Sequence, residues 1–189
     1  MRTIIIAGCL ALVALAGCSI TSSPAAAATD TMPVTHGQND RVPGGARWTQ
    51  HYFPTADGVE LHADVLLPER LPEGAKAPLV LSVGAYSGHS GQLSMEGFAH
   101  TGPSARFSYL VGEGRLLERG YGLVMVHSRG FGGSTGCTQA IGGPADQADV
   151  RAALDWAAVQ PWSTGSVAMY GKSLDGVTAL VGNNLTTPR

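Results

Sequence analysis

Charged residues are scarce in this sequence: they make up 14% of its 189 residues, and only Lys76 and Lys172 are lysines. With a net charge of −2 and no basic block, nucleic-acid binding has no electrostatic support. The three cysteines and six histidines lack the spacing of metal ligands, so we expect neither a metal nor a cofactor. The hydrophobic share, 44%, fits one globular domain once the ends are set aside.

Long hydrophobic runs are also lacking, because the apolar run over residues 4–16 is too short to span a bilayer. Arg2 precedes it, and it ends in LAGC at Cys18, as in a bacterial lipoprotein signal. We therefore expect residues 1–18 to be a signal peptide with its lipobox, and Cys18 to carry the lipid of an exported, membrane-anchored protein. A plain secretory signal cut after the alanines at 25–28, or a buried apolar helix, is the alternative.

A polar segment follows, and the domain begins after it. Residues 19–45 are rich in Ser, Ala, Thr, Pro and Gly and show no apolar period, which predicts a disordered tether. Strand-like patterns then cover residues 48–53, 59–67, 79–83, 121–127 and 167–170. Helical patterns cover residues 107–119, the segment from Pro144 to a stop at Pro161, and the segment after 173.

This succession predicts an α/β fold over residues 46–189. The turn PTADG between the first two strands favours an antiparallel hairpin. Alternating strands and helices after it predict a mostly parallel, doubly wound sheet whose working edge lies at the carboxyl ends of the strands. The glycine-rich segments 84–106 and 128–137 are expected to be surface loops.

The stretch SVAMYGKSLDGVTAL, residues 166–180, reads as a buried strand, a tight turn and a helix. Gly171 and Gly176 would let the chain bend sharply and leave Ser173 exposed, as in the nucleophile elbow of α/β hydrolases. An ordinary turn with an N-capping serine is an alternative. A phosphate-binding loop is disfavoured, since an apolar strand stands where exposed backbone N–H groups would be needed.

Several stretches together carry a more specific signal. They are DGVELHADVLLP (57–68), GAY (84–86), HSRGFGGSTG (127–136), DQADVRAALDWAAVQPW (146–162) and the stretch at 166–180. In order and spacing, the series resembles the N-terminal half of the X-prolyl dipeptidyl-peptidase and cocaine-esterase-like family of serine hydrolases. The resemblance implies the N-terminal part of an α/β-hydrolase fold, with the C-terminal strands and cap missing.

The resemblance also implies roles for single residues. Ser173 matches the nucleophile, and the hydroxyl of Tyr86 with the backbone N–H of Leu174 matches the oxyanion donors. The expected substrate is a peptide or a small ester or amide, cleaved through an acyl-enzyme. Leu174 departs from the family, since many members have a tyrosine there.

A second departure concerns the rest of the catalytic triad. In this fold the acid and the histidine follow the serine, but residues 176–189 contain no Asp and no His. We therefore expect a truncated chain that is inactive by itself; a non-catalytic exported remnant, or a carboxylesterase or acylase of the same fold, is the alternative. Cys137 is expected either to pair with a cysteine in the missing part or to be a buried free thiol.

Overall fold

The structure is a computed structural model, and it describes residues 42–87 and 102–185. The predictions for the signal peptide, Cys18 and most of the tether therefore lie outside the described residues. In the two described ranges, no helix combines the length and the apolar character needed to cross a membrane. The same ranges hold no group of three or more metal-binding side chains.

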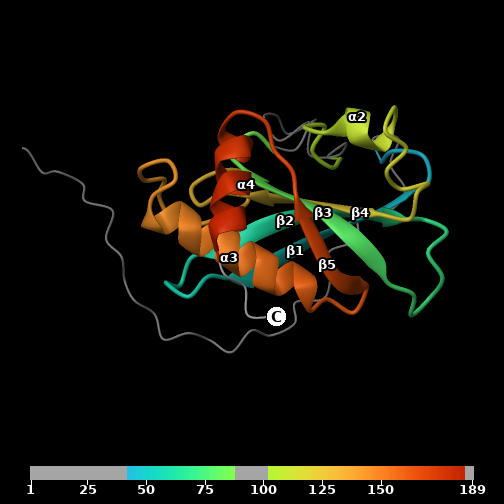
Figure 1. Cartoon of the computed structure of the whole chain (residues 1–189), viewed down its shortest axis with the longest axis horizontal. Helices are drawn as coiled ribbons and strands as arrows, with labels where there is room; N and C mark the ends of the chain where they lie inside the picture. Colours follow the sequence, from blue (N-terminus) through green and yellow to red (C-terminus); the bar gives the residue numbers. More distant parts are fainter. Residues whose placement is uncertain (1–41, 88–101, 186–189) are drawn as a thin grey trace, which may run out of the picture.

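Five strands form one mixed sheet in the order β1-β2-β4-β3-β5 (Figure 1). The strands are β1 (Ala46–Pro54), β2 (Glu60–Pro68), β3 (Ala77–Gly84), β4 (Gly122–His127) and β5 (Ser163–Met169). β1 and β2 form the predicted antiparallel hairpin, and β2 joins β4 in antiparallel register. β3 lies between β4 and β5 and runs parallel to both, so their carboxyl ends meet at one edge of the sheet.

The helices agree with the prediction except for the first. They are α2 (Ser108–Val111), α3 (Pro144–Ala158) and α4 (Leu174–Asn184). A helix over residues 107–119 was wrong: the chain leaves the helix at Gly112, and the N–H of Gly114 reaches back to the carbonyl of Tyr109 (2.8 Å). A Cβ on Gly114 would lie 2.7 Å from the carbonyl oxygen of Leu110, so this tight turn requires glycine.

Alternating side chains of the strands build a separate core on each face of the sheet. Leu79, Leu81 and Val83 of β3 belong to the core under α3 and α4. The opposite core contains Phe107 and Leu117, which come from the segment that includes α2. In Figure 1, α3 and α4 accordingly lie together on one side of the sheet and α2 lies on the other.

The predicted burial of the last strand is wrong. β5 is the edge strand of the described sheet, so Ala168 is exposed instead of buried. On α4 the buried side chains are Asp175 and Thr178, whereas Val177 is exposed. Cys137 is exposed and disulfide-bonded, so the alternative of a buried free thiol is wrong.

Candidate active site

Ser173 lies in the turn between β5 and α4, where the backbone is strained. Its φ is 63° and its ψ is −124°, and the residue is exposed. A non-glycine residue holds such angles only when the surrounding structure enforces them, and these conformations cluster at active sites. The side chain of Ser173 makes no capping hydrogen bond to α4, so the alternative of an ordinary N-capping serine is wrong.

The two glycines of the turn have unequal roles. A Cβ on Gly171 would overlap the main-chain carbonyl of Asp175, so the close approach of these segments requires glycine. A Cβ on Gly176 would lie 3.5 Å from the carbonyl oxygen of Gly171, which is an ordinary contact. The structure therefore requires glycine at position 171, whereas position 176 has room for a methyl group.

Leu174 is the first residue of α4 and directly follows Ser173. Among the described residues, no hydrogen-bond acceptor satisfies the N–H of Leu174. Further along the first turn, the N–H groups of Gly176 and Val177 both donate to the carbonyl of Ser173 (2.9 and 3.1 Å). An unpaired N–H at the start of a helix can stabilise negative charge on a nearby oxygen.

Tyr86 lies two residues after β3, the strand adjacent to β5. Because β3 and β5 are parallel, Tyr86 and Ser173 both follow strand ends at the same edge of the sheet. The side chain of Tyr86 is 49% exposed, and its ring faces the guanidinium of Arg106, whose Cζ lies 4.6 Å from the ring centroid.

Arg106 contacts both Tyr86 and the turn around Ser173. The sequence analysis did not identify this residue. Its Nε donates to Oδ2 of Asp175 (2.8 Å), and its Nη2 donates to the carbonyl of Lys172 (2.9 Å). The available signal was Asp175 itself: a carboxylate in the first turn of a helix that packs on a sheet needs a cation or donors. No local pattern could show that the cation comes from residue 106.

Asp175 is fully buried, although it is ionisable. Burial raises the pKa of this carboxyl above its ordinary value of 3.8, while the hydrogen bond and the charge of Arg106 act in the opposite direction. Its Oδ1 has no hydrogen-bond partner in the described part of the chain. The carboxylate is thus held by one donor and is only partly satisfied.

Of the histidines in the described ranges, His127 lies at the same carboxyl edge of the sheet as Ser173, because it ends β4 opposite Gly84 of β3. His51 lies on β1, at the opposite edge of the sheet from β5, with its ring against Trp156 (5.3 Å between centroids). His127 is buried, accepts a hydrogen bond at Nδ1 from the N–H of Gly133 (3.0 Å) and contacts the ring of His62 (4.7 Å). The remaining histidines, His36, His89 and His100, lie outside the described residues.

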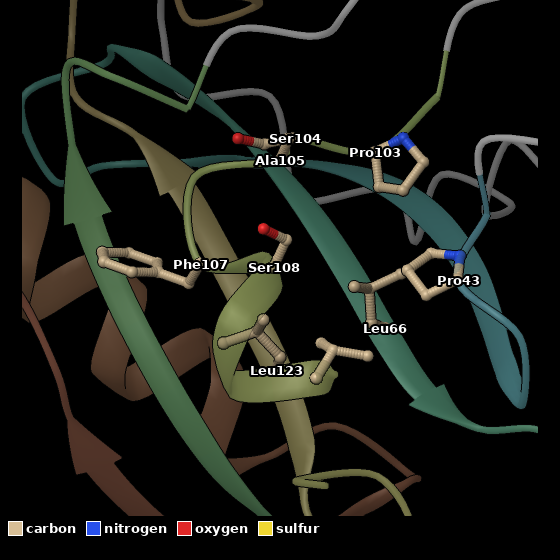
Figure 2. Close-up of a pocket in the computed structure, with 9 residues that line it drawn as sticks. Pro43, Leu66, Pro103, Ser104, Ala105, Phe107, Ser108 and Leu123 are labelled. Atoms are coloured by element: carbon tan, nitrogen blue, oxygen red, sulfur yellow. The ribbon is translucent and has the colours of Figure 1, made fainter. Parts of the chain in front are cut away.

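A small apolar cavity lies on the α2 face of the sheet. It has a volume of about 110 Å³, and Figure 2 shows Leu66, Phe107 and Leu123 among the side chains around it. A second hollow, beside Pro78 and Val167, lies along the edge strand β5. Neither Ser173 nor Tyr86 lines either of these two hollows.

An exposed, strained serine between a parallel strand and a helix defines a class, that of the α/β hydrolases. The sequence model of the X-Pro dipeptidyl-peptidase (S15) family matches residues 57–189. The chain therefore belongs to this family of serine hydrolases, and the resemblance in the sequence is confirmed.

Individual relatives agree with this assignment. A Mycobacterium bovis protein that carries the name serine esterase is 31% identical over 139 residues, which are 71% of this chain and 22% of that protein. The chain thus spans about a fifth of the length of that relative.

Solved structures show the same fold. A CocE/NonD family hydrolase from Staphylococcus aureus superposes with a TM-score of 0.52 at 20% identity, covering 72% of this chain and 25% of that one. An acetyl xylan esterase from Paenibacillus sp. R4 gives a TM-score of 0.55 at 18% identity, covering 79% of this chain and 48% of that one. At such identities these neighbours show the α/β-hydrolase fold alone.

Proposed function

We propose that Ser173 is the nucleophile of a serine hydrolase that cleaves an ester or amide bond. The observation that carries this proposal is the strained backbone of an exposed serine, φ 63°, at the start of α4. The N–H of Leu174 and the phenol of Tyr86 would donate to the oxyanion, and removing one such donor typically lowers kcat by about 10²–10³-fold.

The reaction would proceed through an acyl-enzyme. Oγ of Ser173 attacks the carbonyl carbon, a base takes the hydroxyl proton, and the π electrons move to the carbonyl oxygen. Collapse of this intermediate breaks the bond to the alcohol or amine, which leaves with the proton, and water then releases the acid by the same steps. In this fold the base is a histidine that follows the serine, whereas every histidine of this sequence precedes Ser173, with the ring of His51 against Trp156 and that of His127 against His62.

The substrate class that we favour is an ester. The M. bovis relative, at 31% identity, carries the name serine esterase, whereas the name of the family describes X-Pro dipeptidyl-peptidases. Cleavage of an X-prolyl peptide is the alternative. Matched p-nitrophenyl ester and X-Pro p-nitroanilide substrates would separate the two, with the higher kcat/KM expected for the ester.

The nucleophile can be tested with a fluorophosphonate probe on the full-length natural protein that contains this chain. We expect labelling of the wild type and none of Ser173→Ala. Ser166→Ala is the matched control, because Ser166 is also an exposed serine of the same segment. Labelling that survives in Ser173→Ala would refute the assignment.

A non-catalytic remnant is the second candidate function, and the placement of the histidines favours it. For this reason we expect the 189-residue chain alone to hydrolyse activated esters at no more than the background rate. Cooperative thermal unfolding of this chain without fluorophosphonate labelling is expected of a folded remnant. Rapid turnover by the purified chain would contradict both statements.

We further propose that the protein is exported and anchored by a lipid on Cys18. The support is the LAGC sequence after a short apolar run. Metabolic labelling with a palmitate analogue should mark the wild type and not Cys18→Ala. If the mature N-terminus instead follows the alanines at 25–28, the protein is secreted without an anchor.

A further inference from the structure

The guanidinium of Arg106 contacts three different groups beside Ser173. Nε binds the carboxylate of Asp175, Nη2 binds the carbonyl of Lys172, and the guanidinium carbon lies over the ring of Tyr86. Its side chain is only 23% exposed, and its Cζ also lies 5.3 Å from the ring centroid of Phe107. One side chain thus connects the turn after β5 with the segment after β3.

The two hydrogen bonds bracket the candidate nucleophile. Lys172 directly precedes Ser173, and Asp175 directly follows Leu174. Arg106 therefore fixes the chain on both sides of the two residues that would supply the attacking oxygen and one oxyanion donor. Because the φ of Ser173 is unfavourable, surrounding contacts must hold it, and these bonds are suited to that task.

The carboxylate of Asp175 also lies against the end of β3. A Cβ on Gly84 would overlap Oδ1 of Asp175, so glycine is required at this position. Gly84 is two residues before Tyr86. The buried carboxylate and the Arg106 that binds it therefore touch both the first turn of α4 and the segment that carries Tyr86.

A pair of tyrosines holds the segment of Arg106 in place. The hydroxyl of Tyr109, in α2, lies 2.7 Å from that of Tyr170, which directly precedes the turn. The ring of Phe107 packs edge-on against Tyr170, with 5.4 Å between centroids. Arg106 thus comes from a segment that is attached to the end of β5 by independent contacts.

We propose that Arg106 is a positioning residue of the oxyanion site. It keeps the phenol of Tyr86 and the N–H of Leu174 in one arrangement, so that both can donate to the same substrate oxygen. The inference deepens the function proposed above and rests on it. Lysine could not replace arginine here, because an ammonium lacks the planar face that stacks on the tyrosine ring and the fork that spans two acceptors.

The test uses fluorophosphonate labelling rates and ester kinetics of the full-length natural protein. The variants are Arg106→Gln, Arg106→Lys, Tyr86→Phe and the double variant Arg106→Gln/Tyr86→Phe. Arg115→Gln is the matched control, since Arg115 also pairs with an acid, Glu118, but lies on the exposed surface. Thermal unfolding of each variant separates lost folding from lost positioning.

We expect Arg106→Gln to lower the labelling rate and kcat between about 10- and 100-fold, the cost of a misplaced group, with little change in KM. Arg106→Lys should recover part of the rate at most, and Arg115→Gln should match the wild type. In the double variant the loss should be smaller than the product of the two single losses, because Arg106 acts through Tyr86.

Other results would overturn the proposal. Wild-type rates in a folded Arg106→Gln or Arg106→Lys variant would show that the residue positions nothing, and strictly multiplicative losses would show that it does not act through Tyr86. If Arg106→Gln does not fold, Arg106→Lys carries the same comparison. A wild-type protein that is not labelled at Ser173 overturns the proposed function itself, which is a distinguishable result.

Discussion

Arg129 and Arg106 each bind a buried aspartate, and they do so in opposite ways. Arg129, 4% exposed, donates through Nε and Nη2 to Asp149 and through Nη1 and Nη2 to both oxygens of Asp57. Its backbone N–H also donates to the second oxygen of Asp149 (3.0 Å). Every carboxylate oxygen of this cluster therefore has a donor.

The cluster around Arg106 is incomplete by comparison. Arg106 divides its donors between one carboxylate oxygen of Asp175 and a main-chain carbonyl, and Oδ1 of Asp175 has no partner in the described ranges. A saturated network rigidifies a fold, while a partly satisfied buried charge costs stability. From this difference we expect Arg129 to contribute mainly to stability and Arg106 mainly to the arrangement proposed for the site.

The largest effect is expected from Arg129→Met. This change leaves the buried carboxylate of Asp149 without its cation, and breaking a buried pair in this way costs about 3–5 kcal/mol. Urea unfolding of the protein should show a correspondingly lower midpoint at unchanged slope. Arg106→Met is the matched change in the other cluster, and we expect it to lower the free energy of unfolding by less. An equal or larger decrease for Arg106→Met would contradict the contrast between the two clusters.

A second large effect concerns the backbone that Arg106 holds. Gly171→Ala must displace the carbonyl of Asp175, so we expect it to lower stability by about 1–3 kcal/mol and to abolish labelling of Ser173. Gly176→Ala has room for its methyl group, and alanine favours a helix interior by up to about 1 kcal/mol, so it should be neutral or stabilising. Equal losses in the two variants would contradict the structure.

This contrast also shows where sequence reasoning was sufficient. The strand-like runs on either side of the PTADG turn predicted β1 and β2, and Pro144 and its apolar stripe predicted α3, because these signals are local. Burial was predicted less well. β5 looked like a buried strand from its residues, but its exposure depends on its place at the edge of the described sheet, which no local pattern records.

For the candidate site, the sequence predicted the turn around Ser173 but not the arginine that binds it. A glycine-flanked serine after an apolar strand indicated the turn, and the structure gives Ser173 the strained φ of that turn. Arg106 could not be found, since it lies 69 residues before Asp175 and belongs to no motif. Pairings across such distances are set by the sheet order, which places the segments after β3 and β5 side by side.

Smaller changes in stability should distinguish Asp149, which binds Arg129, from Asp175, which binds Arg106. Asp149→Asn removes the charge that faces a buried Arg129, and charged hydrogen bonds of this kind contribute about 1.5–3 kcal/mol. Asp175→Asn removes a charge that is costly to bury, and Arg106 keeps some access to water, so a change of less than about 1 kcal/mol is expected. Chemical denaturation at neutral pH measures both, and a greater loss for Asp175→Asn would contradict the distinction.

The last prediction uses the opposite pKa shifts of two aspartates. Hydrogen bonds from Arg129 lower the pKa of Asp57 below 3.8, so its stabilising contribution is present above that value and is lost as the pH falls through the lowered pKa. Burial raises the pKa of Asp175, so its contribution is present below 3.8 and is lost as the pH rises through the raised pKa.

Measured between about pH 2 and pH 7, the free energies of unfolding of Asp57→Asn and Asp175→Asn should therefore diverge from the wild type with opposite slopes. Relative to the wild type, Asp57→Asn should become less stable as the pH rises, because it lacks a carboxylate that the fold prefers charged. Asp175→Asn should become relatively more stable over the same range, because it lacks one that the fold prefers neutral. Parallel curves would mean that Arg106 satisfies Asp175 as fully as Arg129 satisfies its partners, and the contrast between the two clusters would disappear.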